Sequence, residues 1–232
     1  MRNVLVLGGS RGIGAAIVRR FATAGATVAF TYSGSHAAAV ALANEVGAEA
    51  IKADSADRQA VTGAVQSCGA LDVLVVNAGV ILLGDPRTLD ADAVDHLIDV
   101  NVRAPYHASV EAAKRMNDGG RIIIIGSVNG DRMAFAGAAA YGLSKSALQG
   151  MARGLARDFG DRGITVNVVQ PGPVDTDMNP ADGPMKDQMH SFMAIKRHVR
   201  PDEVAAMVAY LASSDAAMVT GAMHTIDGGF GA

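Results

Sequence analysis

The chain has 232 residues, half of them hydrophobic, and a formal net charge of −3. This near-neutral charge excludes the basic surface of a protein that holds a nucleic-acid polymer, and no apolar run reaches the roughly 18 residues that span a bilayer. Cys68 is the only cysteine, so no internal disulfide forms. Because Met1 leads straight into an apolar segment, we expect no signal peptide and a cytoplasmic location.

The first predicted element is a short buried strand, Val4–Leu7, followed by a glycine-rich turn with Gly8, Gly12 and Gly14. Apolar residues then take helical spacing. A strand, a glycine turn and a helix place a phosphate on the unpaired N–H groups of the helix N-terminus. The turn alone is weak evidence, because a tight turn between strand and helix needs no ligand.

Strand and helix signals alternate along the rest of the chain. Further strands are predicted at Thr27–Thr31, Ala48–Ala53, Leu71–Asn77, Arg121–Gly126, Ile164–Gln170 and Ala222–Ile226. Helices are predicted at His36–Val46, Asp57–Ser67, Ala91–Met116, Ala139–Asp158 and Pro201–Ser213. The central strands are apolar on both faces, as in a parallel sheet covered by helices. The pattern predicts an α/β protein with one doubly wound domain over residues 1–232.

Ligands of such sheets bind outside the carboxyl ends of the strands. Polar and turn residues follow six of the predicted strands, and together they outline a cleft. The candidate cofactor contacts are Gly8, Ser10, Arg11, Gly12, Ile13, Gly14, Ser33, Asp54, Ser55, Asn77, Ala78, Gly79, Pro171, Gly172, Val174 and Thr176. Asp54 could instead cap the helix that begins near Asp57.

Tyr141 and Lys145 lie four residues apart in a predicted helix, so they share one face. A positive charge about 4 Å from a phenol, at an effective dielectric of about 20, stabilises phenolate by roughly 4 kcal/mol. The pKa of Tyr141 would then move from about 10 towards 7. A tyrosine tuned in this way exchanges protons with an alcohol or ketone near neutral pH, while the Ser127 hydroxyl could hold the carbonyl oxygen.

These motifs, with Asn101, Asn77-Ala78-Gly79 and Pro171-Gly172, resemble the short-chain dehydrogenase/reductase family over essentially the whole chain. The resemblance implies a Rossmann fold with seven parallel strands. It also implies a catalytic set of Asn101, Ser127, Tyr141 and Lys145. In that set Tyr141 is the general acid/base, Lys145 lowers its pKa and holds the nicotinamide ribose, Ser127 orients the carbonyl, and Asn101 supports a water relay.

Two features depart from the family pattern. Leu7 stands where a threonine is usual, so a hydroxyl brace to the Asn77 loop is missing. The Ser127–Tyr141 spacing is one residue longer than the commonest one. Neither change removes a catalytic group, but the second leaves the substrate open.

The sequence favours NADP(H) over NAD(H), because Tyr32 stands where an NAD-binding protein places an acid for the ribose hydroxyls. Arg11 and Ser33 are available for a 2′-phosphate. We therefore predict an NADP(H)-dependent oxidoreductase that acts on a small carbonyl or alcohol substrate. The six histidines show no paired ligand spacing, so no metal site is predicted.

A second hypothesis is a regulator that binds cyclic di-GMP on a reductase scaffold. It arises because stretches such as GSVNGDRM and VTGAMHTIDG resemble a bacterial member of the family that binds this ligand. No compact arginine cluster is apparent in the sequence. Cyclic di-GMP is therefore expected in the glycine-turn cleft, in competition with NADPH.

Two further expectations concern the surface. The methionine-rich segment from Met178 to Met193 is interrupted by Pro180, Gly183 and Pro184, and is either core or a mobile substrate lid. The long helical segments around Asp99–Met116 and Ala139–Asp158 and the C-terminal stretch Gly221–Ala232 resemble family interfaces. They predict a homodimer or homotetramer, with the tetramer favoured.

Overall fold

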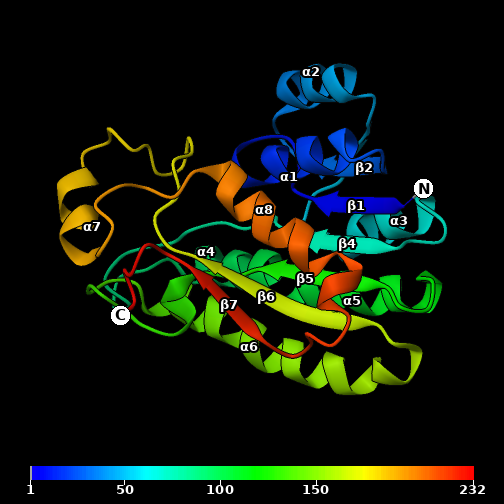
Figure 1. The fold of residues 1–232 in the computed structure, drawn as a ribbon. Helices are drawn as coiled ribbons and strands as arrows, with labels where there is room; N and C mark the ends of the chain where they lie inside the picture. The colour runs from blue at the N-terminus through cyan, green and yellow to red at the C-terminus, as the bar shows by residue number, and fades with distance from the viewer. Residues whose placement is uncertain (1) are drawn as a thin grey trace.

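The structure is a computed structural model that describes residues 2–232, and a seven-stranded sheet forms its centre (Figure 1). The strands are β1 Asn3–Leu7, β2 Thr27–Tyr32, β3 Glu49–Lys52, β4 Val73–Val76, β5 Arg121–Ile125, β6 Thr165–Pro171 and β7 Met223–Ile226. Their order is β3-β2-β1-β4-β5-β6-β7, and every neighbouring pair is parallel. The predicted fold class is confirmed.

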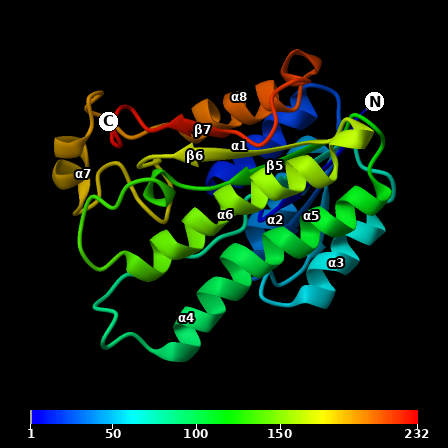
Figure 2. The same ribbon diagram turned by 90° about the horizontal axis from the view of Figure 1, so that it is seen from below.

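Helices cover both faces of the sheet, as Figure 2 shows. The helices are α1 Gly12–Thr23, α2 His36–Val46, α3 Arg58–Ser67, α4 Ala91–Ile98, α5 Ala104–Arg115, α6 Ala139–Asp158, α7 Lys186–Phe192 and α8 Pro201–Leu211. Helices α3, α5 and α6 lie side by side on one face, and α1 and α8 pack on the other. In place of the single helix predicted for Ala91–Met116, a π-helical turn at Asp99–Arg103 joins α4 to α5.

The apolar run of β1 is explained by these two layers. Val4 and Val6 point into the core formed with α1, α2 and α8, whereas Leu5 and Leu7 point into the core formed with α3, α5 and α6. Since side chains alternate along a strand, a strand between two helical layers must be apolar at every position.

The strand order reverses beside β1, which pairs with β2 on one edge and β4 on the other. The connections therefore leave in opposite directions and open a crevice at the carboxyl ends of these strands. The glycine turn and the Asn77 loop flank this crevice.

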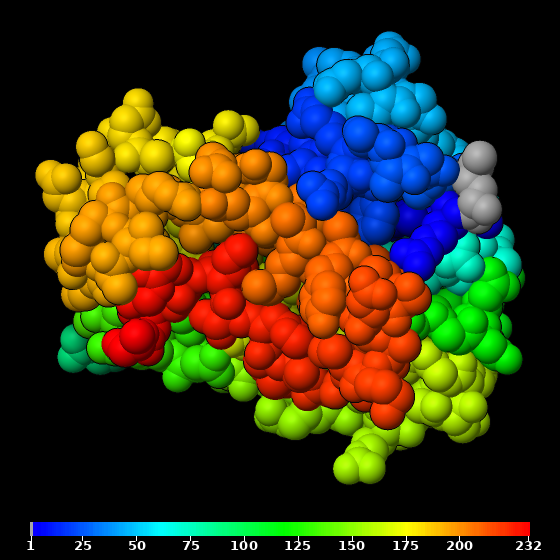
Figure 3. All heavy atoms as spheres, viewed as in Figure 1, coloured from blue at the N-terminus to red at the C-terminus, as the bar shows by residue number. Residues whose placement is uncertain are grey.

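The segment after β6 forms one end of the molecule and contacts the C-terminal residues (Figure 3). Phe192 stacks edge-on against Phe230 with 5.7 Å between ring centroids, and Met193 is buried with Val128 and Phe230. The sequence left this segment as core or lid; the structure gives it one short helix, α7, and one buried methionine. Within residues 2–232, no helix has the length and hydropathy needed to cross a membrane.

Candidate active site

The glycine turn requires glycine for steric reasons, and Gly8 and Gly14 illustrate why. Gly8 has a φ of +76°, and a Cβ there would lie 2.7 Å from the Cα of Ala78. A Cβ on Gly14 would lie 2.1 Å from the carbonyl oxygen of Gly8. Only glycine therefore permits this close approach of β1, the first turn of α1 and the loop after β4.

Hydrogen bonds fix the turn against both neighbouring strands. The Asn77 amide donates to the carbonyl of Gly8 at 2.7 Å, and the backbone N–H of Gly8 donates to the hydroxyl of buried Thr31 at 2.9 Å. The backbone N–H groups of Asn77 and Ala78 both donate to the carbonyl of Leu7. The brace expected to be missing with a leucine at position 7 is thus supplied by the backbone. Thr31 was not predicted, because a threonine within a strand carries no local signal.

The N-terminus of α1 is suited to an anion. Arg11 occupies the N-cap position in an extended conformation, no side chain caps the helix, and no acidic residue lies in its first turn. Backbone N–H groups without a side-chain acceptor, beside a turn in which Gly8 and Gly14 leave no space for a Cβ, form the cradle that a dinucleotide pyrophosphate needs. The residues present therefore fit a nicotinamide dinucleotide.

The groups predicted to select a 2′-phosphate are accessible. The Arg11 side chain is 63% exposed, and its nearest acid is Asp177, with 3.9 Å between nitrogen and oxygen. Ser33 is exposed directly after β2. Tyr32 is buried, and its hydroxyl forms a 2.8 Å hydrogen bond with Nδ1 of His36. No carboxylate occupies the end of β2.

Lys145 is buried on the inner face of α6. Its ammonium donates to the carbonyl of Ile125 at 3.1 Å and lies 5.9 Å from the ring centroid of Tyr141. Burial lowers the pKa of Lys145 to about 8, because the apolar surroundings disfavour the charged form.

Tyr141 and Ser127 meet despite the longer spacing, because a 3₁₀ turn at Val128–Gly130 takes up part of the connection. Burial raises the pKa of Tyr141, and a hydrogen bond with Ser127 opposes that rise. The expectation of a lowered pKa is therefore wrong in this structure. The ammonium of Lys145 is held by a backbone carbonyl rather than at the phenolic oxygen, so desolvation dominates.

Asn101 lies within the π turn, a geometry often found at functional sites. Its amide accepts from the backbone N–H of Val80 and donates to the Val80 carbonyl, both at 2.9 Å. It also donates to the hydroxyl of Ser144 at 3.0 Å. A Cβ on Gly79 would lie 3.4 Å from both the Asn101 oxygen and the Lys145 nitrogen, so these two groups border the same backbone. Ser144 was not predicted.

Most of the other predicted cofactor contacts lie near the glycine turn or follow β6. Thr176 lies close to the glycine turn: a Cβ added to Gly12 would lie 3.2 Å from the methyl group of Thr176. Gly172 packs against Asp227. Pro171 ends β6, Val174 forms a backbone bridge with Val199, and Ser10 and Ile13 flank the glycine turn.

Asp54 and Ser55 lie apart from these, in the loop after β3. Asp54 accepts from the backbone of Ala56, and Asp57 caps α3, so the capping alternative for Asp54 is wrong. Neither Ser33 nor Asp54 forms a side-chain hydrogen bond with the four predicted catalytic residues. Among residues 2–232, no group of three or more His, Cys, Asp or Glu side chains could hold a metal ion.

The fold and this site define a dinucleotide-binding scaffold with a tyrosine and a buried lysine on α6. The family model described as Enoyl-(Acyl carrier protein) reductase matches residues 8–231. The chain belongs to the short-chain dehydrogenase/reductase family, as its sequence motifs predicted.

Named relatives cover nearly the full chain. The chain is 68% identical over 231 residues to the "Cyclic-di-GMP-binding biofilm dispersal mediator protein" of Escherichia coli (strain K12), covering 100% of this chain and 98% of the relative. It is 38% identical to the 3-oxoacyl-(acyl-carrier-protein) reductase MabA of Mycobacterium tuberculosis H37Rv, covering 99% and 93%.

Solved structures agree with the fold. The crystal structure of BdcA in complex with NADPH has a TM-score of 0.98 and 68% identity, and covers 100% of this chain and 95% of the other. A short-chain dehydrogenase from Burkholderia cenocepacia J2315 in complex with NADP has a TM-score of 0.97 and 47% identity, covering 100% and 98%.

Proposed function

We propose that this protein is an NADP(H)-dependent oxidoreductase that transfers hydride between nicotinamide and a carbonyl or alcohol substrate. The observation that carries the proposal is the meeting of Ser127, Tyr141, Lys145 and Asn101 beside the glycine turn. Family membership and the NADPH and NADP complexes of similar proteins support it.

Each residue has a role that its contacts support. When bound, the reduced nicotinamide supplies the hydride. The Ser127 hydroxyl orients the carbonyl oxygen, and Tyr141 gives that oxygen its proton. The raised pKa of Tyr141 keeps the phenol protonated, which is the form that carbonyl reduction consumes.

Two further residues support this acid. Lys145 lies between Tyr141 and the Gly79 backbone, where its ammonium can hold a ribose and replenish the proton. Asn101 positions the Val80 backbone at the mouth of the same space through two hydrogen bonds. In this proposal the four groups together position the carbonyl and supply its proton.

The proposed cofactor preference rests on charge. Arg11 can pair with a 2′-phosphate at the glycine turn, and Ser33 can donate to it, while the end of β2 offers no acid for an unmodified ribose. The loop after β3, with Asp54 and Ser55, is proposed to contact the adenine.

The test is a panel of ketones and aldehydes, assayed for oxidation of NADPH and, in parallel, of NADH. We expect turnover of at least one carbonyl compound with NADPH and weaker turnover with NADH. Absence of turnover with any carbonyl, in protein that binds NADPH, would overturn the enzymatic proposal.

A second candidate function is binding of cyclic di-GMP, favoured by the name of the 68% identical relative. We propose it as a regulatory property of the same scaffold. Direct titration of cyclic di-GMP into purified protein tests it independently of turnover.

We propose a homodimer or homotetramer, a single domain and a cytoplasmic location. A groove between α5 and α6 has a volume of about 340 Å³ and is lined by Tyr106, Gly150, Met151, Gly154 and Leu155. Exposed apolar side chains and glycines on two long helices suit close packing against a second copy. Light scattering at micromolar concentration measures the assembly, and a monomer would refute it.

A further inference from the structure

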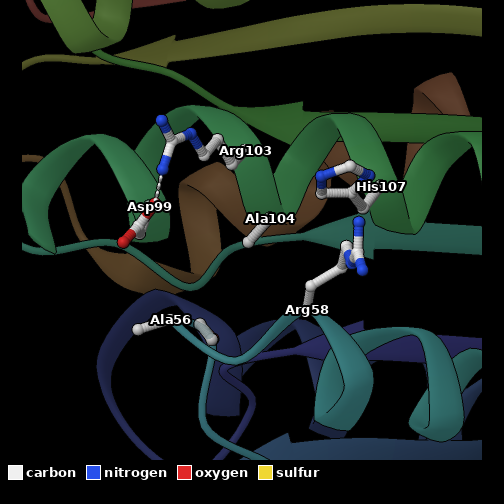
Figure 4. Close-up of a pocket in the computed structure, with 7 residues that line it drawn as sticks. Ala56, Arg58, Asp99, Arg103, Ala104 and His107 are labelled. Carbon is white, nitrogen blue, oxygen red and sulfur yellow. Dashed lines mark hydrogen bonds and ion pairs between the residues drawn. The ribbon is translucent and has the colours of Figure 1, made fainter. Parts of the chain in front are cut away.

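A hollow outside the catalytic cleft separates the loop after β3 from the π turn and the start of α5 (Figure 4). Its volume is about 300 Å³, at the small end of the range for ligand pockets. It is lined by Ser55, Ala56, Arg58, Asp99, Arg103, Ala104 and His107.

The lining carries an excess of positive charge. Arg103 pairs with Asp99 at 2.6 Å, which neutralises one cation. Arg58 comes from the opposite wall and extends towards His107, as Figure 4 shows, and no ion pair of Arg58 occurs within residues 2–232. Arg58 and Arg103 are 45 positions apart in the chain, and the packing of α3 on α5 places both in the lining of one pocket.

We infer that this pocket binds a phosphate group carried by a nucleotide, and that cyclic di-GMP enters it with one of its nucleotides. A guanidinium binds phosphate through a fork of N–H groups, and it pairs in the same way with the edge of guanine. The Arg58 fork and the His107 ring supply donors from two walls. The small volume admits one nucleotide and leaves the remainder of a dinucleotide at the open side.

The pocket also borders the proposed active site. Asp99 and Arg103 belong to the π turn, whose middle residue Asn101 holds the Val80 backbone. Ser55 lines the pocket and is a proposed adenine contact. A phosphate here would therefore lie against the π turn and the loop after β3, which also carry Asn101 and the proposed adenine contacts.

This inference deepens the proposed binding of cyclic di-GMP and does not depend on reductase activity. It replaces the expected location in the glycine turn. The two locations differ in one measurable way. A ligand at the glycine turn excludes NADPH. A ligand at the pocket that Arg58 lines shares only Ser55 with the proposed cofactor contacts, so we expect it to bind in the presence of NADPH.

The experiment is equilibrium dialysis of radiolabelled cyclic di-GMP, and separately of radiolabelled inorganic phosphate, against the full chain with saturating NADPH. Arg58→Ala tests the pocket, and Arg20→Ala removes an exposed arginine from the far end of α1 as the matched control. Because Arg103 and His107 also border the α5–α6 groove, light scattering of each variant checks that its assembly is unchanged.

We expect cyclic di-GMP to bind in the presence of NADPH, with affinity reduced about 10- to 100-fold by Arg58→Ala, as for loss of a charge-assisted hydrogen bond. Arg20→Ala should bind as the unmodified protein does. Asp99→Asn provides an independent test, because removing the neutralising carboxylate should tighten binding even if Arg58→Ala folds poorly.

The outcomes separate the site from the function. Phosphate binding that depends on Arg58, without binding of cyclic di-GMP, would keep the phosphate site and refute cyclic di-GMP as its ligand. Competition between cyclic di-GMP and NADPH would refute binding at this pocket, and so would binding that is insensitive to both Arg58→Ala and Asp99→Asn. Either result would leave the proposed binding of cyclic di-GMP to the protein intact. Binding of neither probe would overturn the pocket.

Discussion

The two sides of the cleft are built in opposite ways. On the catalytic side, Asn101, Ser144 and Lys145 are buried and bonded to backbone carbonyls or to one another. The α7 segment (residues 173–200), by contrast, exposes Met178, Met185, Phe192 and Ile195. Groups that are proposed to move protons need fixed geometry, whereas an exposed segment without such a proposed role tolerates looser packing.

The largest expected effect lies on the catalytic side. Tyr141→Phe removes the transferable proton and keeps the ring, so turnover should fall by about 10²- to 10⁴-fold, the usual loss of an acid/base group. Affinity for NADPH should change little. Steady-state assays with the best carbonyl of the panel measure this, and Tyr210→Phe, an exposed tyrosine on α8, is the control. Full activity of the Tyr141 variant would remove the tyrosine from the mechanism.

The next effect concerns the glycine turn. Arg11→Ala should reduce the preference for NADPH over NADH by about 10- to 150-fold, equivalent to one charge-assisted bond of 1.5–3 kcal/mol. Calorimetric titration of both nucleotides measures the ratio. Equal affinities in the unmodified protein would contradict the proposed role. Asp177→Asn, which frees Arg11 from its nearest acid, should leave the preference intact or strengthen it.

The rigidity of the catalytic side has a cost in stability. The pKa of Lys145 is about 8 in the folded protein and about 10.5 in the unfolded chain, so between these values the unfolded chain binds more protons and stability rises with pH. Lys145→Met should therefore be more stable at pH 7 by about 1–3 kcal/mol, after loss of one hydrogen bond. Urea denaturation at pH 7 and 9.5 should show this advantage shrinking at the higher pH. A constant difference would mean that Lys145 does not titrate as proposed.

The smallest effect is expected in the α7 segment. His190 on α7 and buried His198 share a hydrogen bond of 2.8 Å. His190→Ala should raise KM for the carbonyl by about 2- to 12-fold, the range for one neutral hydrogen bond. It should leave kcat nearly unchanged. A fall in kcat as large as that of Tyr141→Phe would erase the distinction between the two sides.

The His190–His198 pair makes the stability of the α7 segment depend on pH. Burial lowers the pKa of His198 first, and the neighbouring His190 lowers it further. Because the unfolded histidine then binds protons at higher pH than the folded one, the contribution of His198 to stability is lost as pH falls below about 6.5. Hydrogen exchange of α7 should increase over that range, and His190→Ala should reduce the change.

The sequence alone predicted the seven strands in chain order, most of the helices, the glycine turn and the Tyr141–Lys145 pair. These follow from local rules: a strand between two helical layers is apolar throughout, a turn without space for Cβ needs glycine, and residues four apart share a helix face. The sequence showed that Leu7 offers no hydroxyl to the Asn77 loop, but not the two backbone hydrogen bonds that connect Leu7 to this loop, because no side chain indicates them.

Only the tertiary structure decided the environment of each group. The direction of the Tyr141 pKa shift depended on burial and on the Ile125 carbonyl that holds Lys145, and both are set by the packing of α6 on β5. The hydrogen bond of Thr31 and the shared lining of one pocket by Arg58 and Arg103 involve residues distant in the chain. Local patterns report periodicity, whereas charge and solvation are summed over neighbours that only folding brings together.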